Sequence, residues 1–205
     1  MKQEELNEIL AQHKLWLEDN EKGERAYLRE ANLQGADLQG ANLQKADLWS
    51  IRLREADLRE ANLRWADLQG ANLWEANLRW ADLWKANLRE ANLRWADLQG
   101  ANLQEANLQE ANLWKADLQK ANLRWADLQG ANLQRTNIYT FQADGHFAWN
   151  HENWIQIGCE GHTISKWLAM YEQIGKKHDY SEEEVKWYGS WIQLVTNMRD
   201  NENNK

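Results

Sequence analysis

Apolar residues recur every five positions between Ala26 and about Thr140, in the unit Ala-Asp/Asn-Leu followed by two variable residues. This period predicts no amphipathic helix, because successive leucines would lie about 140° apart around the helix axis. On a flat strand, an odd period would send successive leucines to opposite faces. The pattern therefore predicts a chain that turns a corner at every repeat and keeps its Ala and Leu side chains inside.

The repeat runs through 23 consecutive pentapeptides, and the unit A(D/N)LXX is the signature of the pentapeptide-repeat family. The chain resembles that family throughout residues 26–140. The resemblance implies an all-β solenoid, a right-handed quadrilateral β-helix with four pentapeptides per coil, and therefore about six coils. Two units depart from the pattern, with Ile51 and Thr136 at the alanine position, and they are expected to mark local adjustments.

A second, longer period overlies the first and equals six pentapeptides. The sequence LREANLRWADLQGANL occurs at Leu58–Leu73 and again at Leu88–Leu103, which indicates duplication of a block of that length. Because six pentapeptides make one and a half coils, duplicated tryptophans such as Trp65 and Trp95 are expected on opposite faces of the solenoid.

The segments on either side of the repeat follow other patterns. Residues 3–18 have the i, i+3, i+4, i+7 apolar spacing of an amphipathic helix, which is expected to cover the open end of the solenoid. His13 lies on that apolar face and is expected to pack there. Short strands between Phe141 and Ile157, followed by two helices, predict a small α+β module. The predicted domains are an N-terminal helical cap (1–25), the pentapeptide-repeat β-helix (26–140) and a C-terminal module (141–205).

The C-terminal module contains two helix starts and a second resemblance. Thr163 is placed to cap one helix, and Ser181-Glu182-Glu183-Glu184 forms a capping box for the other. The stretch Ile155-Gln156-Ile157-Gly158-Cys159, with His162-Thr163-Ile164 and Trp167-Leu168 after it, resembles a module that follows pentapeptide repeats in bacterial and phage proteins. Those proteins have no assigned function, so this resemblance implies no activity.

The same module contains the residues that could carry metal or catalytic chemistry. Cys159 and His162 form a C-x-x-H pair with His146 and His151 upstream, and four such side chains could bind zinc. However, the histidines are irregularly spaced, and a lone strand cysteine is usually a small buried apolar residue. A Cys–His catalytic pair would also need an oxyanion donor that no motif supplies. We therefore expect no metal, cofactor or catalytic residue.

Tryptophan is abundant at the outward positions of the repeat. Side chains four pentapeptides apart are expected to stack in columns, and one column contains Arg54, Trp74, Arg94 and Trp114 in succession. Guanidinium-on-indole stacking would stabilise such a column by about 0.5–1 kcal/mol per contact. Exposed aromatic side chains are also typical of protein contacts, and both interpretations stay open. The candidate contact residues are Trp49, Trp74, Trp84, Trp114, Trp149 and Trp154.

Charge and composition narrow the functional classes. The net charge is −8, but residues 26–140 hold 15 acidic and 14 basic residues, so no basic patch indicates direct nucleic-acid binding. Some members of the family, the quinolone-resistance group, are acidic rods that resemble DNA and bind gyrase, a role that a near-neutral repeat fits poorly. The single cysteine excludes an internal disulfide and favours a cytoplasmic location. No apolar run is long enough to span a membrane.

The sequence favours a non-enzymatic scaffold that acts through an unidentified protein partner, with a homodimer through the C-terminal module as a further expectation. Two alternatives stay open: a DNA-mimicking modulator of gyrase or topoisomerase, and a Cys/His metal or catalytic module carried on a repeat stalk. No phosphate-binding glycine loop, paired-carboxylate motif or dinucleotide fingerprint is present.

Overall fold

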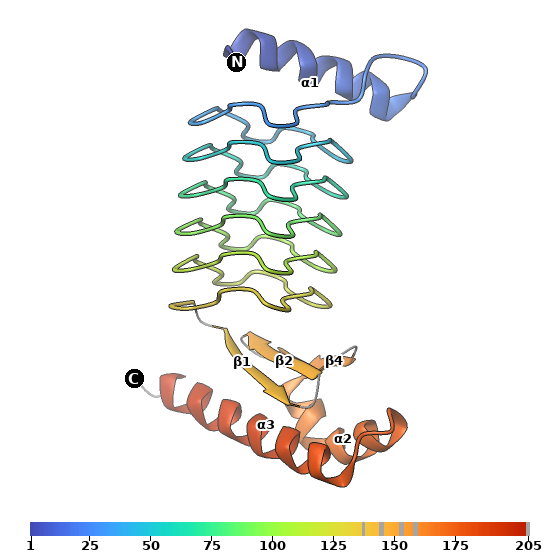
Figure 1. Cartoon of the computed structure of the whole chain (residues 1–205), viewed down its shortest axis with the longest axis vertical. Coiled ribbons are helices and arrows are strands. Elements are labelled where there is room, and N and C mark those ends of the chain that lie inside the picture. The colour runs from blue at the N-terminus through green and yellow to red at the C-terminus, as the bar shows by residue number, and fades with distance from the viewer. Residues whose placement is uncertain (137, 144–145, 152–153, 158–159, 204–205) are drawn as a thin grey trace. The chain divides into compact units, whose positions relative to one another are not determined.

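The computed structural model of the chain describes residues 1–136, 138–143, 146–151, 154–157 and 160–203. Residue contacts divide the chain into two compact units, Met1–Asn137 and Ile138–Lys205. The first unit consists of helix α1 (Gln3–Glu18) and the stacked coils of the repeat (Figure 1). The described part of the second unit consists of short strands followed by helices.

The coils of the first unit are joined by a parallel hydrogen-bond ladder. Each Asp/Asn position bridges the same position four pentapeptides later, from the pair Tyr27–Asp47 through to the pair Asn112–Asn132. The amide of each repeat leucine from Leu28 to Leu113 donates to a carbonyl of the next coil, at 2.8 Å for Leu33. Each pentapeptide therefore lies directly over the pentapeptide that precedes it by four units in the sequence.

Alanine and leucine side chains fill the inside of the coils. The repeat leucines from Leu43 to Leu113 are fully buried, with 0% of their surface exposed. The larger Ile51 at an alanine position is also fully buried, and its carbonyl still accepts the amide of Asn72 at 2.8 Å. The ladder therefore continues unbroken through this departure from the pattern. One buried leucine in each pentapeptide contributes about 1.5–3 kcal/mol.

Each pentapeptide ends in a tight turn that contains a left-handed residue. Every fifth residue from Glu30 to Arg135 has a positive φ, between 50° and 71°. The next amide donates to the leucine carbonyl, as Ala36 does to Leu33 at 3.1 Å, which makes a type II turn. The Asp/Asn oxygen also accepts the amide of the fourth residue of its pentapeptide. Most of these left-handed residues are not glycine, so the ladder holds them in a conformation that costs about 1–2 kcal/mol each.

Helix α1 packs against the first coil through two buried side chains, Leu6 and His13. His13 Nδ1 accepts a hydrogen bond from the amide of Ala26 at 3.1 Å, and Nε2 lies 3.0 Å from the carbonyl oxygen of Gln44. The imidazole is therefore neutral, with its proton on Nε2. Burial lowers the pKa of His13, and the positive charge of Arg25 adds to this effect.

The second unit contains an antiparallel sheet in the order β1-β2-β3-β4, followed by two helices (Figure 1). Thr163 caps α2 by accepting the amide of Lys166 at 3.3 Å. Ser181 and Glu184 exchange two hydrogen bonds of 2.7 and 3.2 Å at the start of α3, so the expected capping box is present. The elements are β1 (Tyr139–Ala143), β2 (His146–His151), β3 (Trp154–Ile157), β4 (Glu160–Thr163), α2 (Ile164–Lys177) and α3 (Glu182–Asn203).

Buried apolar side chains from the sheet and both helices form the core of the second unit. Trp167 of α2 donates its indole N–H to the carbonyl of Ile155 in β3 at 2.8 Å, which ties this helix to the sheet. Among the described helices, none is long and apolar enough to cross a membrane. The core residues are Ala148, Ile155, Ile157, Ile164, Trp167, Ile174, Tyr188, Trp191, Ile192 and Val195.

Glycine-to-alanine substitutions at two turns should separate backbone strain from crowding. A Cβ atom at Gly40 would meet no atom within 4 Å, whereas one at Gly100 would collide with the indole of Trp80. We expect Gly40→Ala to lower the free energy of unfolding by about 1–2 kcal/mol. Gly100→Ala should cost about 1–3 kcal/mol more, measured by denaturant unfolding. In a Trp80→Ala background the excess at Gly100 should disappear, and its persistence would rule out crowding as the cause.

Acidification should destabilise the docking of α1 through His13. The folded state lowers the pKa of His13 from 6.5, so the folded chain binds this proton less readily than the unfolded chain. The stability contributed by neutral His13 is therefore complete above about pH 6.5 and declines as the pH falls below it. Between about pH 7 and pH 5, the wild type should lose more unfolding free energy than His13→Gln. Parallel pH curves for the two proteins would refute this linkage.

Candidate functional site

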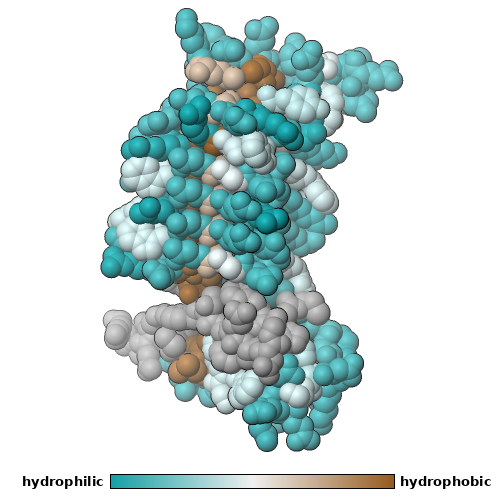
Figure 2. Space-filling view, in the orientation of Figure 1, coloured by the Kyte–Doolittle hydropathy of each residue, from teal (hydrophilic) through white to brown (hydrophobic). Residues whose placement is uncertain are grey.

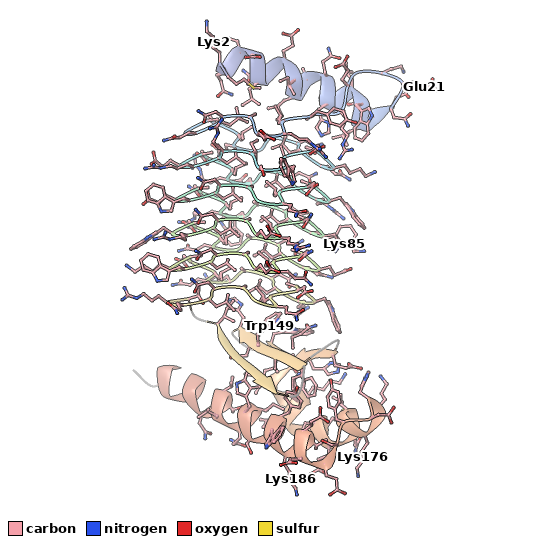
Figure 3. The ribbon with its side chains drawn as sticks, in the orientation of Figure 1. Lys2, Glu21, Lys85, Trp149, Lys176 and Lys186 are labelled. Carbon is pink, nitrogen blue, oxygen red and sulfur yellow. The ribbon has the colours of Figure 1, made fainter. Side chains whose placement is uncertain are left out.

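The fourth and fifth residues of each pentapeptide lie at the corners of the coils, where their side chains extend outward (Figure 3). Because residues four pentapeptides apart lie directly over one another, these side chains form columns along the stack. The face of the coils seen in Figure 2 is largely hydrophilic. The tryptophans of the repeat are therefore set among polar and charged neighbours, and their contacts determine what this surface can bind.

The expected stacking of arginine on tryptophan is present in one column. The guanidinium carbon of Arg54 lies 3.8 Å from the ring centroid of Trp74, and that of Arg94 lies 5.0 Å from Trp114. Both distances are within the range of cation–π attraction. Trp74 and Trp114 are half-buried, so part of each ring stays accessible to solvent.

Two clusters each combine a pair of perpendicular indoles with a lysine over both rings. The centroids of Trp65 and Trp84 are 5.2 Å apart with ring planes at 80°, and Lys85 Nζ lies 4.7 and 4.6 Å from them. In the second cluster the centroids are 5.3 Å apart, the planes lie at 82°, and the lysine distances are 3.7 and 4.7 Å. The two clusters are six pentapeptides apart in the sequence, which is the same offset as between the two copies of the duplicated block. We name them the Trp84 cluster (Trp65, Trp84, Lys85, Glu105) and the Trp114 cluster (Trp95, Trp114, Lys115, Arg135).

A carboxylate completes the Trp84 cluster, whose Lys85 lies at the edge of the stack in Figure 3. Glu105 Oε1 accepts the indole N–H of Trp84 at 3.2 Å, and Oε2 lies 3.2 Å from Lys85 Nζ. Burial alone would raise the pKa of Glu105, but the hydrogen bonds from Lys85 and Trp84 and the charge of Lys85 lower it overall. Glu105 is therefore ionised and balances the charge of Lys85. The equivalent residue of the Trp114 cluster is Arg135, whose guanidinium carbon lies 5.6 Å from the Trp114 centroid.

The other candidate tryptophans lie in different environments. Trp49 lies on the coil with 37% of its surface exposed. Trp149 in β2 is buried. Trp154, at the start of β3, is half-buried and packs over Gly161, where a Cβ would come within 2.6 Å of its ring. The structure thus brings Trp84 and Trp114 into clusters and leaves Trp49 apart from them; a contact role for all six candidates stays a prediction.

Four tryptophans outside the candidate set are more exposed than any member of it. Trp65, Trp80, Trp95 and Trp125 have 47%, 57%, 44% and 40% of their surfaces exposed. The sequence pattern puts all four outward but gives no reason to prefer them. All of them occupy the fifth position of their pentapeptide, which is the left-handed residue of each turn. This shared position is the sequence feature that could have identified them.

Glu160 is the centre of a charged cluster in the second unit. Its carboxylate lies 3.0 Å from His162 Nε2, 2.6 Å from His178 Nε2 and 3.1 Å from Lys177 Nζ. Burial would raise the pKa of Glu160, but the hydrogen bonds from Lys177 and His178 lower it overall. Burial and the nearby Lys166 charge lower the pKa of His162. This arrangement ties β4 to the end of α2.

The proposed Cys159–His162 pair is only half visible, because Cys159 lies outside the described residues. His162 is occupied by Glu160. Within the described ranges, no group of three or more His, Cys, Asp or Glu side chains is arranged to hold a metal ion. No contact among the described residues supports a metal or catalytic role for this pair.

The most acidic column of the coils contains Asp37, Asp57, Asp97 and Asp117, and arginine pairs with two of these aspartates. Arg59 Nε donates to Asp57 at 2.9 Å, and Arg79 Nη1 lies 3.7 Å from Asp97 Oδ2. The hydrogen bonds from Arg59 lower the pKa of Asp57. Duplex DNA carries one uncompensated negative charge per about 1.7 Å of its axis, which this paired column does not reproduce.

The chain is similar to pentapeptide-repeat proteins. A family model described as Pentapeptide repeats (8 copies) matches residues 24–59, 36–75, 76–114 and 106–139. The chain is 34% identical to HetL, a pentapeptide repeat protein involved in heterocyst differentiation regulation from the cyanobacterium Nostoc sp. strain PCC 7120. That similarity covers 53% of this chain and 64% of HetL, with a TM-score of 0.35.

The chain is also similar to two further solved structures. The pentapeptide repeat protein Rfr23 from the cyanobacterium Cyanothece 51142 is 38% identical over 52% of this chain and 63% of its own, with a TM-score of 0.31. QnrB1, a plasmid-mediated fluoroquinolone resistance protein, is 22% identical over 58% and 68%, with a TM-score of 0.23. The chain thus spans just under two thirds of HetL and Rfr23. The comparison with curated proteins gives no match.

A double-mutant cycle should measure the stacking of Arg54 on Trp74. If the contact stabilises the coil, Arg54→Gln and Trp74→Gln will show a coupling free energy of about 0.5–1 kcal/mol in denaturant unfolding. Trp49 is the matched control, because it makes no contact with Arg54 and the effects of Arg54→Gln and Trp49→Gln should add. Additive effects for Arg54 and Trp74 as well would show that the stacking does not contribute to stability.

Proposed function

The chain belongs to the pentapeptide-repeat family, and on this premise we propose that it is a non-enzymatic scaffold that acts by protein–protein contact. Members of this family form right-handed β-helices. The contact residues in this proposal are the outward tryptophans of the coils, together with the cations stacked on them, and they form patches on more than one face of the coils. The outward tryptophans are Trp49, Trp65, Trp74, Trp80, Trp84, Trp95, Trp114 and Trp125.

The observation that carries the proposal is the occurrence of two Trp–Trp–Lys clusters on a rigid backbone ladder. Trp and Arg are the residues most enriched at the energetic centres of protein interfaces. Here both are held in place by stacking before a partner arrives, so binding would order few side chains and lose little entropy. A column of preorganised indoles and cations therefore suits recognition of another protein.

The finer architecture supports a scaffold in which the coils present the contact surface. Residues 26–140 form about six coils in this proposal, and residues 1–25 cap their first end, supported by the contacts of His13 with the first coils. Residues 141–205 are a separate module that could pair with a second copy of the chain. Its exposed apolar side chains, which include Leu168 of α2 and Leu194 of α3, support that role.

The two alternative functions have weaker support. A DNA mimic needs an uncompensated acidic face, and the most acidic column pairs Asp57 with Arg59 and Asp97 with Arg79. A metal or catalytic module needs His162 and Cys159 to act together, whereas His162 contacts Glu160. Neither alternative is favoured by a specific contact among the described residues.

Affinity capture with the full chain tests the proposal. We expect at least one protein to be retained by the wild type and lost when Trp65, Trp80 and Trp95 are all replaced by Gln. Loss of three exposed indoles should weaken binding by about a hundredfold or more, since central interface tryptophans each contribute about 2 kcal/mol or more. Quantitative mass spectrometry of the captured proteins gives the measurement.

Trp187→Gln is the matched control, because Trp187 is 37% exposed but lies on α3 in the second unit. It should leave capture unchanged. Equal capture by the triple variant and the wild type would overturn a contact through the coils. Inhibition of gyrase supercoiling by micromolar protein would instead support DNA mimicry.

A further inference from the structure

The two tryptophan clusters form a natural comparison, because duplication has given them the same indoles and the same lysine with a different fourth residue. In the Trp84 cluster, the carboxylate of Glu105 bridges two donors, the indole N–H of Trp84 and the ammonium of Lys85, at 3.2 Å each. The cluster thus shows how a carboxylate fits against this pair of donors. The equivalent donors in the Trp114 cluster are Trp114 Nε1 and Lys115 Nζ.

The donors of the Trp114 cluster have no carboxylate partner in the part of the chain that the structure describes. Trp114 Nε1 donates no hydrogen bond there, and the side chains of Lys115 and Arg135 take part only in cation–π contacts. Arg94 lies over the same indole, 5.0 Å from its centroid. Three cations therefore surround Trp114 without an anion to balance them.

We propose that the Trp114 cluster binds a Glu or Asp carboxylate of the partner protein, in the place that Glu105 takes in the Trp84 cluster. One carboxylate oxygen accepts the indole N–H of Trp114, and the other faces Lys115. Arg135 adds a charged donor where the Trp84 cluster has its own acid. This inference rests on the proposed scaffold function and names the chemistry of the partner surface, a short acidic segment.

Charge favours an acidic protein segment over a nucleic acid. The chain as a whole has a net charge of −8, so a long polyanion is repelled outside this cluster. Nucleic-acid binding relies on many phosphate contacts along a basic strip, whereas the uncompensated cations here gather at one indole. A carboxylate also matches the two-donor geometry that Glu105 displays.

Reciprocal substitutions test the site in the full chain. The probe is a fluorescently labelled hexaglutamate peptide, with binding followed by fluorescence anisotropy. Arg135→Glu places an internal carboxylate in the cluster and should weaken binding by about tenfold or more. Glu105→Arg removes the internal carboxylate of the Trp84 cluster and should raise the stoichiometry from about one peptide per chain to about two.

Lys45→Glu is the matched control for charge and backbone. Lys45 and Arg135 both occupy the fifth position with φ of 60° and 61°, and Lys45 makes no contact with Trp114. Glutamate already occupies this turn position at Glu55 and Glu105, so the substitution is compatible with the fold. Melting temperatures of both variants should stay close to that of the wild type, and peptide binding by Lys45→Glu should be unchanged.

Three results would overturn the carboxylate site. One is no binding of hexaglutamate to the wild type. Another is equal weakening by Lys45→Glu and Arg135→Glu, which would mean that only net charge matters. The third is stronger binding of an oligothymidylate of equal charge, which would identify a phosphate ligand. Each can occur while partner capture still depends on Trp65, Trp80 and Trp95, so failure of this site is distinguishable from failure of the scaffold function.

Discussion

The four-pentapeptide hydrogen-bond register is the constraint on which the rest of the first unit depends. It places leucine over leucine and, except at Ile51, alanine over alanine through the repeat, so the interior of the coils is continuous and buried. It also holds every fifth residue in a left-handed turn, although most of these residues are Glu, Lys or Trp. A ladder that is extended with every coil offsets the cost of these turns, which an isolated pentapeptide could not do.

The same register determines the chemistry of the surface. An outward side chain meets partners one coil further along the stack, so a duplicated block copies whole clusters and not only single residues. The Trp84 and Trp114 clusters have nearly the same ring and lysine geometry for this reason. Within that fixed frame, a single difference between Glu105 and Arg135 changes a charge-balanced cluster into a cationic one. Evolution of this surface can therefore alter its ligand without altering its backbone.

The sequence predicts the coil well, because a period of five is compatible with burial only if the chain turns at every repeat. Stacking of Arg54 on Trp74 also follows, since both occupy the same column. The indole pairs do not follow, because Trp65 holds a fifth position and Trp84 a fourth position, in neighbouring columns. Outside the repeat, no sequence period determines which face of a short strand is buried. The burial of a strand side chain there depends on the elements that pack against the sheet. The sequence therefore does not predict that the candidate Trp149 is buried.

The central claim is that the outward corners of the coils carry the contact surface. Oxidative footprinting of the full chain, with and without a captured partner, measures this most directly, because it reports the solvent access of each indole. We expect the partner to protect Trp95 and Trp114 from oxidation and to leave Trp187 of α3 as reactive as before. Protection of Trp187 together with unchanged oxidation of Trp95 and Trp114 would contradict this claim.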